Sequence, residues 1–397
     1  MSRILPADRT KNVRYAIRDL VVKAQELEKK GEKIIYLNIG DPLKYDFRTP
    51  QHLIEAVENN WQNSSSYADS MGIEEARKAV AGEALRLGIK NVSKEDVIMT
   101  SGGSEGISMA IGAIMNSGEN ILTPKPGYPL YNAVINYLQG QENEYELNEE
   151  DNWQPDIDDM RKRINEKTQA IVLINPNNPT GGVYTRSILQ KVLDLAGEHN
   201  LVVFSDETYD KLLLDEDAKF TAAGSLSDDI PVVTFNTLSK NYLVPGWRVG
   251  WCIFSGAGIE DYEEAVKKLA RARLSISHPM QYAVKPALEG RHDHLVDVKN
   301  KLRKRRDITY KRLNEINGIS CVKPRAAFYA FPKIELKIES DEKFILDLLK
   351  KEKVLFVHGS GFGQKQGTNH FRVVFAASEE ALSEAFDRLE NYVEKRL

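Results

Sequence analysis

Residues 232–254 read VVTFNTLSKNYLVPGWRVGWCIF, and the rest of the fold can be worked out from this stretch. The runs VVTFN (232–236) and VGWCIF (249–254) predict two buried strands, because β-branched and aromatic residues dominate them. Between the strands, residues 237–248 carry only two charges, Lys240 and Arg248. Charged residues make up 28% of the chain, so a connection with just two cations indicates a specific use for them.

Similar apolar strands recur upstream and alternate with helical patterns. They are VIMTS (97–101), NIL (120–122), AIVLIN (170–175) and LVVFSD (201–206). Apolar runs without polar alternation are typical of a parallel sheet that helices cover on both faces. We therefore predict an α/β fold whose large domain, residues 46–285, holds a mostly parallel sheet covered by helices.

The chain changes character after residue 286. A long charged helix (291–317) is followed by short strands, AAFYAFPKIE, VLFVHG and HFRVVFA, and by helices near 340–352 and 378–395. At the other end, residues 13–30 predict an amphipathic helix, because Ile17, Leu20, Val21, Ala24 and Leu27 recur at helical spacing. We predict a smaller α+β domain built from both chain ends, residues 1–45 plus 286–397.

Length and composition exclude several classes of protein. The 397 residues exceed one compact core, so two domains are expected. The net charge of −4 gives no basic surface for nucleic acid, and the basic run 299–306 is interpreted as a solvated helix face. No run approaches the ~20 apolar residues of a membrane span. Two cysteines and no signal-like apolar N-terminus favour a cytoplasmic protein that binds neither nucleic acid nor membrane.

Polar groups follow the strands at the edge where doubly wound sheets bind ligands. SGGSEG (101–106) offers backbone N–H groups to an anion, or is only a tight turn. NPNNPTG (175–181) offers a fixed amide, or is only a rigid turn. Asp206 faces a cation or caps a helix. Lys240 can form a Schiff base or lie at the surface, and Arg248 suits phosphate or carboxylate.

Taken together, these groups match the needs of pyridoxal phosphate. Its phosphate requires N–H donors and a cation, its aldehyde requires a lysine, and its ring nitrogen requires a carboxylate. A nicotinamide dehydrogenase is disfavoured, because the glycines of SGGSEG lack the dinucleotide-binding spacing.

The chain resembles the fold-type I pyridoxal-phosphate enzymes, in particular the class I and II aminotransferases. The resemblance covers nearly the whole length and rests on ordered motifs. They are NIGDP (38–42), Tyr67 with Gly72 and Glu75-Ala76-Arg77, SGGSEG (101–106), PGYPLY (126–131), NPNNPTG (175–181), SDETYD (205–210), TLSKNYLVPGWRVG (237–250) and FRVVFA (371–376). Position 237 is Thr where the family usually has Ser, which keeps a hydroxyl.

The resemblance implies a role for each matching residue. Lys240 binds the cofactor as a Schiff base and moves the proton at the substrate Cα. Asp206 pairs with the ring nitrogen, Tyr209 and Asn178 contact the phenolic oxygen, and Tyr128 stacks on the ring. The phosphate is held by the backbone of Gly103, Ser104 and Glu105, by Thr237, Ser239 and Arg248, and by Tyr67 of the neighbouring subunit in a homodimer. Arg372, Asn178 and the Gly40 backbone bind the substrate carboxylate.

The resemblance also implies the reaction, transamination between an L-amino acid and a 2-oxo acid. The N-terminal text looks most like that of alanine aminotransferases, so alanine with 2-oxoglutarate is our first expectation. Aspartate or aromatic aminotransferases, or a β-lyase on the same fold, are the alternatives. A regulator that uses this fold to bind an effector is disfavoured, because one helix and no winged-helix segment precedes NIGDP.

Overall fold

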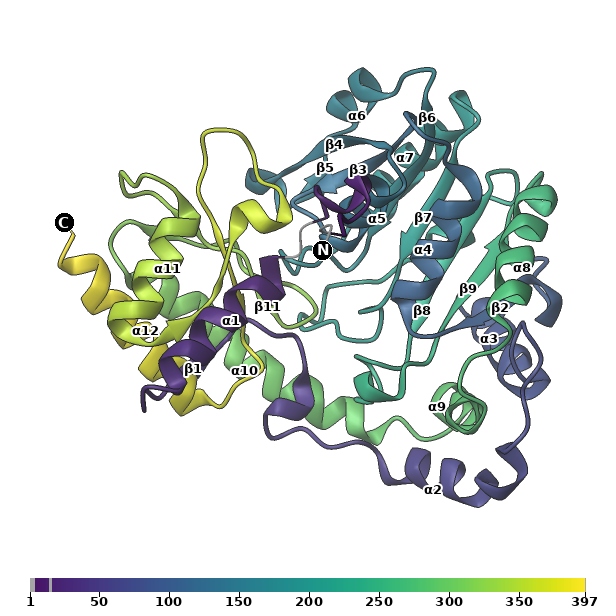
Figure 1. The fold of residues 1–397 in the computed structure, drawn as a ribbon, viewed down its shortest axis with the longest axis horizontal. Coiled ribbons are helices and arrows are strands. Elements are labelled where there is room, and N and C mark those ends of the chain that lie inside the picture. The colour runs from purple at the N-terminus through teal and green to yellow at the C-terminus, as the bar shows by residue number, and fades with distance from the viewer. Residues whose placement is uncertain (1–3, 14–15, 397) are drawn as a thin grey trace.

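The computed structural model describes residues 4–13 and 16–396. Residues 14 and 15 of the helix predicted over 13–30 lie outside the described residues, and so does the side chain of Ile17. The large domain is built on an eight-stranded sheet of order β2-β9-β8-β7-β6-β3-β4-β5 (Figure 1). The strands are β2 (Val97–Thr100), β3 (Asn120–Lys125), β4 (Gln141–Asn148), β5 (Gln154–Pro155), β6 (Thr168–Ile174), β7 (Val202–Asp206), β8 (Val232–Thr237) and β9 (Gly250–Ser255).

The sheet is mostly parallel, as predicted. Strands β4, β3, β6, β7 and β8 run parallel to one another, whereas β9 is antiparallel to both β8 and β2. Thr237 at the end of β8 pairs with Gly250 at the start of β9. The connection that carries Lys240 and Arg248 therefore lies at the carboxyl edge of the parallel strands, where such sheets bind ligands.

Helices cover both faces of this sheet (Figure 1). On one face lie α4 (Gly103–Ile114), α5 (Leu130–Tyr137) and α8 (Glu260–Arg273), and on the other α3 (Glu74–Arg86), α7 (Arg186–Glu198) and α9 (Val284–Glu289). Within β2, the side chain of Ile98 packs on the face covered by α4, α5 and α8. The side chains of Val97 and Met99 pack on the opposite face. Because successive side chains are buried on opposite faces, strands such as β2 and β6 are largely apolar.

The sequence did not predict strand β4, which reads QENEYELN. Two of its side chains, Tyr145 and Leu147, are buried, whereas the strand begins with exposed Gln141 and Glu142. Its outer neighbour β5 pairs only with Leu147 and Asn148. A strand so near the sheet edge keeps polar side chains in water, so its hydrophobic signal is weak.

The helices α6 (Ile157–Arg163), α8 and α9 were also not predicted.

The small domain joins the two ends of the chain. Its helices are α10 (Asp293–Glu315), α11 (Asp341–Glu352) and α12 (Glu379–Glu394), and its short strands are β10 (Ile319–Ser320), β11 (Tyr329–Ala330), β12 (Lys333–Ile334), β13 (Val354–Leu355), β14 (Val357–His358) and β15 (Phe371–Val374). From the N-terminal end, β1 (Ile35–Tyr36) pairs parallel with β13, and α1 (Ala16–Glu28) contacts α11 and β14. The smaller α+β domain built from both ends is confirmed, while its exact limits stay predictions.

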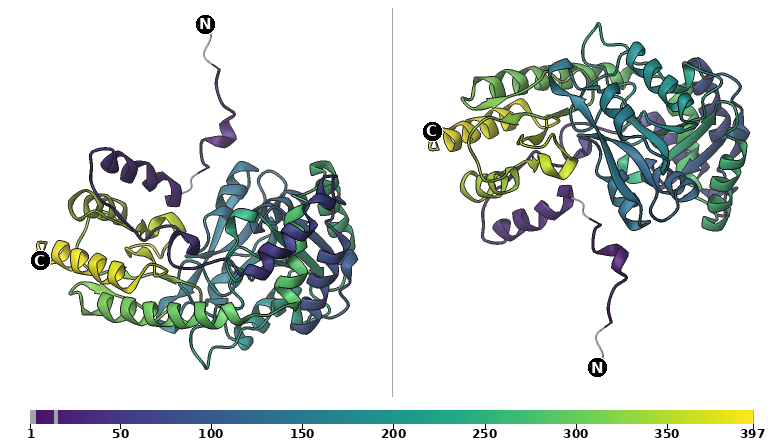
Figure 2. Two further views of the ribbon diagram at one scale, coloured as in Figure 1. Left: turned by 90° about the horizontal axis from the view of Figure 1, so that it is seen from below. Right: turned by 90° about the horizontal axis from the view of Figure 1, so that it is seen from above.

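Two further segments connect the parts. Helix α10 runs from the large domain along the small one, and α2 (Gln51–Asn60) lies beside α9 (Figure 1). The short helix η1 (Asp8–Thr10) contacts α5, where the Arg9 guanidinium lies 5.1 Å from the centre of the Tyr137 ring. Residues 4–7, which precede η1, project from the molecule (Figure 2).

Cys252 and Cys321 are buried free thiols. None of the helices in residues 4–13 and 16–396 is long and apolar enough to cross a bilayer. The described residues also contain no group of three or more His, Cys, Asp or Glu side chains that could hold a metal ion.

Candidate active site

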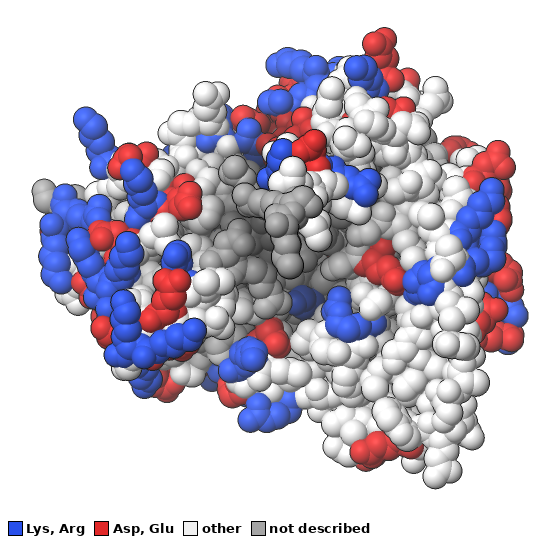
Figure 3. All heavy atoms as spheres, in the orientation of Figure 1, with Lys and Arg blue, Asp and Glu red and all other residues white. Residues whose placement is uncertain are grey.

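A cavity of about 1070 Å³ lies between the two domains, at the carboxyl edge of the sheet. The face drawn in Figure 3 is hollowed there, and Lys and Arg atoms lie inside the hollow. Twelve of the residues predicted for the site line the cavity: Gly40, Gly103, Ser104, Tyr128, Asn178, Asp206, Tyr209, Thr237, Ser239, Lys240, Arg248 and Arg372. Other parts of the wall come from the segment around Gly40 and from the small domain: Tyr36, Ile39, Asp41, Lys44, Tyr45 and Tyr329.

Lys240 reaches into this cavity from the connection between β8 and β9. Its Nζ donates a hydrogen bond of 2.6 Å to the carbonyl oxygen of Gly40, a residue 200 positions away in the chain. The same nitrogen lies 5.9 Å from the centre of the Phe328 ring. Lys240, which belongs to the large domain, is therefore partly buried and held by contacts from the small domain, unlike a mobile surface lysine.

Asp206 ends β7 with its side chain 6% exposed. The Thr208 hydroxyl donates to Oδ1 over 2.7 Å, and the Tyr131 hydroxyl lies 3.5 Å from Oδ2. Burial raises the pKa of Asp206 above its usual value, and the bonds from Thr208 and Tyr131 oppose that rise. A buried carboxylate with only neutral partners is costly, so this one is suited to a ligand that brings a positive charge.

Arg372 on β15 is the most enclosed cation of the site, at 1% exposed. Its Nη1 donates to Asn178 Oδ1 over 3.0 Å, and its Nη2 donates to the carbonyl oxygen of Asn38 over 2.6 Å. The guanidinium lies over the rings of Tyr329 and Phe362, 4.7 and 4.5 Å from their centres. A guanidinium held this rigidly is pre-organised to bind a carboxylate.

The turn before α4 and the end of the β8–β9 connection meet at one side of the cavity. Arg248, with φ +56°, donates from Nη1 to Pro245 O over 2.9 Å and from Nη2 to Ser101 O over 3.3 Å. A Cβ on Gly102, which has φ +72°, would clash with the Arg248 guanidinium, so only glycine permits this approach. The exposed guanidinium therefore lies beside the first N–H groups of α4, an arrangement suited to an anion.

The two predicted hydroxyls are engaged within their own turn. Thr237 Oγ1 donates to Val249 O over 2.7 Å, and it accepts a hydrogen bond of 3.1 Å from the backbone N–H of Ser239. The hydroxyls of Thr237 and Ser239 lie 2.8 Å apart, and both residues line the cavity. These hydrogen bonds stabilise the turn that carries Lys240.

Two predicted residues do not line the cavity. The Glu105 side chain points back to accept from the Ser101 N–H over 2.7 Å and to pair with Arg273 over 2.9 Å, so only its backbone remains for the predicted contact. Tyr67 is 80% exposed on the large domain. Its predicted contact with a neighbouring subunit stays a prediction.

Sequence reasoning missed Tyr329, which begins β11. Its hydroxyl lies 2.7 Å from that of Tyr209, and both residues are buried. Burial is the main cause that raises the pKa of Tyr209 well above its usual value, and the neighbouring Tyr329 adds to this rise. The charge of Arg372 acts in the opposite direction. A Cβ on Gly40 would clash with the Tyr329 hydroxyl. Nothing in AAFYAFPKIE distinguishes this tyrosine from a core residue, so only the folded chain reveals its place.

Comparison with known proteins agrees with this geometry. The chain matches the family described as aminotransferase class I and II over residues 32–389. It is 41% identical to the glutamate-pyruvate aminotransferase AlaA of Haemophilus influenzae over 98% of both chains. It is 39% identical to the alanine aminotransferase of Mycobacterium bovis, over 96% of this chain and 91% of that one. A solved alanine aminotransferase from Pyrococcus furiosus is 44% identical, with a TM-score of 0.95, over 99% of this chain and 100% of that one.

Proposed function

Because the chain belongs to the aminotransferase class I and II family, we propose that it transfers the amino group of alanine to 2-oxoglutarate, forming pyruvate and glutamate, and catalyses the reverse reaction. Two observations support this choice of substrates. Relatives named glutamate-pyruvate and alanine aminotransferases cover almost the whole chain. The cavity also holds a rigid guanidinium, Arg372, that suits the carboxylate common to all four compounds.

We infer that the cofactor is pyridoxal phosphate, because the chemistry of the cavity fits each of its parts. A lysine nitrogen, a buried carboxylate and an arginine beside a helix N-terminus face one space, contributed by Lys240, Asp206 and Arg248. When bound, pyridoxal phosphate supplies an aldehyde that bonds to amines and a ring that withdraws electrons from the substrate Cα. The single observation that carries the proposal is that Lys240 and Asp206 lie on adjacent strand ends of this cavity.

The residues of the chain then have separate tasks. Arg372 would bind the substrate α-carboxylate and orient the Cα–H bond toward Lys240. The Lys240 nitrogen would take that proton from Cα and return it later, as a general base and acid. Asp206 would keep a proton on the ring nitrogen, because a nearby carboxylate favours the charged form. Asn178 and Tyr209 would donate to the phenolic oxygen, and Tyr128 would support the ring.

We also propose a homodimer whose two sites each borrow Tyr67 from the other subunit. The support is the 80% exposure of Tyr67, which leaves this large aromatic side chain free to contact a second chain. The location predicted from the two cysteines is the cytoplasm, where thiols stay reduced.

A titration of the purified protein tests cofactor and donor together. With pyridoxal phosphate added, the wild type should turn yellow, and alanine should discharge the colour with release of one pyruvate per subunit. The Lys240→Ala variant should bind the cofactor and yet release no pyruvate, because the base is lost. Full activity of that variant would refute the assignment. Pyruvate release from cysteine thioethers, with none from alanine, would identify a β-lyase instead.

A further inference from the structure

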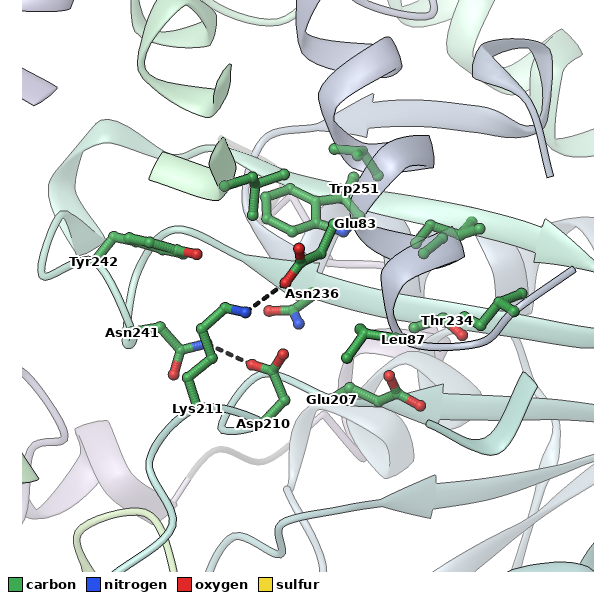
Figure 4. A pocket seen from close by; sticks show the side chains of 15 residues that line it. Glu83, Leu87, Glu207, Asp210, Lys211, Thr234, Asn236, Asn241, Tyr242 and Trp251 are labelled. Carbon is green, nitrogen blue, oxygen red and sulfur yellow. Dashed lines mark hydrogen bonds and ion pairs between the residues drawn. The ribbon is translucent and has the colours of Figure 1, made fainter. Parts of the chain in front are cut away.

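A small pocket of about 10 Å³ lies next to the connection that carries Lys240, and none of its lining residues lines the large cavity. Figure 4 shows polar side chains converging on it from α3, from the turn after β7 and from the turn after β8. Among them, Lys211 pairs with Glu83, and Asn241 bonds to Asp210. Asn241 directly follows Lys240, and Asp210 directly follows Tyr209. The pocket is therefore lined by the chain neighbours of two residues that line the large cavity.

Asn241 is held at both its side chain and its main chain. Its Nδ2 donates to Asp210 Oδ1 over 2.6 Å, and its carbonyl oxygen accepts from His294 Nε2 over 2.9 Å. A carbonyl can only accept, so the proton of His294 lies on Nε2, and burial lowers the pKa of that imidazole. Asn241 is therefore held on one side by Asp210, in the turn after β7, and on the other side by His294 of α10.

These bonds fix the relation between Tyr209 and Lys240. Neighbouring Cα atoms are about 3.8 Å apart, so a bond between Asp210 and Asn241 sets the separation of the residues before them. Asn241 is 1% exposed and Asp210 is 6% exposed, which shields the bond from water. Asp210 also accepts a hydrogen bond from Asn236 of β8, so the turn is tied to the strand as well.

The asparagine at position 241 leaves one of its own polar atoms unpaired. The Oδ1 of Asn241 is buried and has no hydrogen-bond partner among the described residues. Leaving a buried amide oxygen unpaired costs about 1–3 kcal/mol, and an apolar side chain of similar size avoids that cost. Burial also raises the pKa of Asp210, while Lys211 and the bonds from Asn236 and Asn241 act in the opposite direction. The asparagine therefore leaves one buried atom unpaired and keeps its bond to Asp210.

We infer that Asn241 is a positioning residue that, through Asp210 and His294, fixes the Lys240 nitrogen relative to the Tyr209 hydroxyl. This role rests on the proposed function, because it matters only if Lys240 transfers a proton. Displacing a reacting group by about 1 Å costs on the order of a hundredfold in rate, so a small shift of this turn is sufficient to slow the reaction.

The test compares a broken bond with a reversed one. Asn241→Leu removes the amide at similar volume, whereas the double variant Asn241→Asp with Asp210→Asn exchanges amide and carboxylate and lets one N–H···O bond re-form. Asn120→Leu is the matched control, because Asn120 is a 2% exposed asparagine that accepts from Thr168 at the opposite edge of the sheet. Two readouts are taken well below the unfolding temperature: the single-turnover rate with alanine, and the pH at which the bound cofactor changes colour.

We expect Asn241→Leu to slow the single turnover about a hundredfold and to displace the colour change. The exchanged pair should recover to within about tenfold of wild type, and the Asn120→Leu control should lose thermal stability without slowing. If Asn241→Leu does not fold, Asn241→Ser takes its place. Wild-type rate and colour in the broken variant, or no recovery in the exchanged pair, would overturn the inference. A wild type that never turns yellow would instead refute the proposed function.

Discussion

Replacing Glu207 with Gln should make the protein more stable at neutral pH and leave it little changed near pH 4.5. Glu207 is 1% exposed, and its Oε1 accepts from the Ser205 hydroxyl over 2.8 Å and from the Ala223 N–H over 3.0 Å. Its Oε2 has no hydrogen-bond partner among the described residues. Burial raises the pKa of Glu207 from 4.5 to about 8, against the lowering effect of those two bonds.

The sign follows from proton linkage. The folded protein binds this proton more tightly than the unfolded chain, so the contribution of Glu207 to stability is fully present below the unfolded pKa of 4.5 and is lost as the pH rises toward about 8. At pH 7 the folded protein still holds this proton while the unfolded chain has released it, and because one pKa unit is worth about 1.4 kcal/mol, holding it costs about 3 kcal/mol. Gln cannot ionise, and its Oε1 can still accept both hydrogen bonds.

The assay is urea unfolding of the cofactor-free wild type and variant at several values between pH 4.5 and 8. All other titrating groups are common to both proteins, so the difference in unfolding free energy isolates Glu207. It should grow with pH to about 3 kcal/mol at pH 7. Glu166→Gln, on an exposed segment between α6 and β6, is the matched control and should show no such trend. A difference that is constant across the pH range would show that Glu207 does not have a raised pKa in the folded protein.

Three further substitutions test the large cavity. Arg372→Lys keeps the charge but loses the fork that contacts Asn178, so KM for alanine should rise about tenfold or more while cofactor affinity is unchanged; equal loss of both would contradict its placement. Tyr329→Phe leaves the Tyr209 hydroxyl without its partner, and kcat should fall about fivefold to thirtyfold in steady-state assays with no change of fold by circular dichroism. Gly40→Ala introduces a Cβ against the Tyr329 hydroxyl, so substrate affinity should fall, and an unchanged KM would argue against this packing.

The fold was predictable where burial leaves a clear pattern. Strands such as β6 and β8 are buried on both faces, and their unbroken apolar runs identified the parallel sheet. The pattern fails at the sheet edge, where β4 keeps polar side chains in water. The short strands of the small domain pair over as few as two residues, so their partners depend on tertiary packing rather than on local sequence.

The candidate site was predictable where its residues lie at or just after the ends of buried strands. Asp206 and Lys240 follow buried strands directly, and the carboxyl ends of parallel strands share one edge. Tyr329 was not predictable, because it meets Tyr209 across 120 positions of sequence and sits in an ordinary apolar run. Asn241 was overlooked for the same reason, since its partners Asp210 and His294 lie on other segments.

The segment around residues 38–40 explains why some functional contacts leave no trace in residue type. Arg372 of the small domain donates to Asn38 O, and Lys240 of the large domain donates to Gly40 O. Both acceptors are main-chain carbonyls, which every residue has, so no side chain records either bond. What the sequence can record is the lack of a Cβ at Gly40, because any Cβ there would clash with Tyr329. Two cations from different domains thus converge on one short stretch of backbone, and the packing of Tyr329 restricts position 40 within it to glycine.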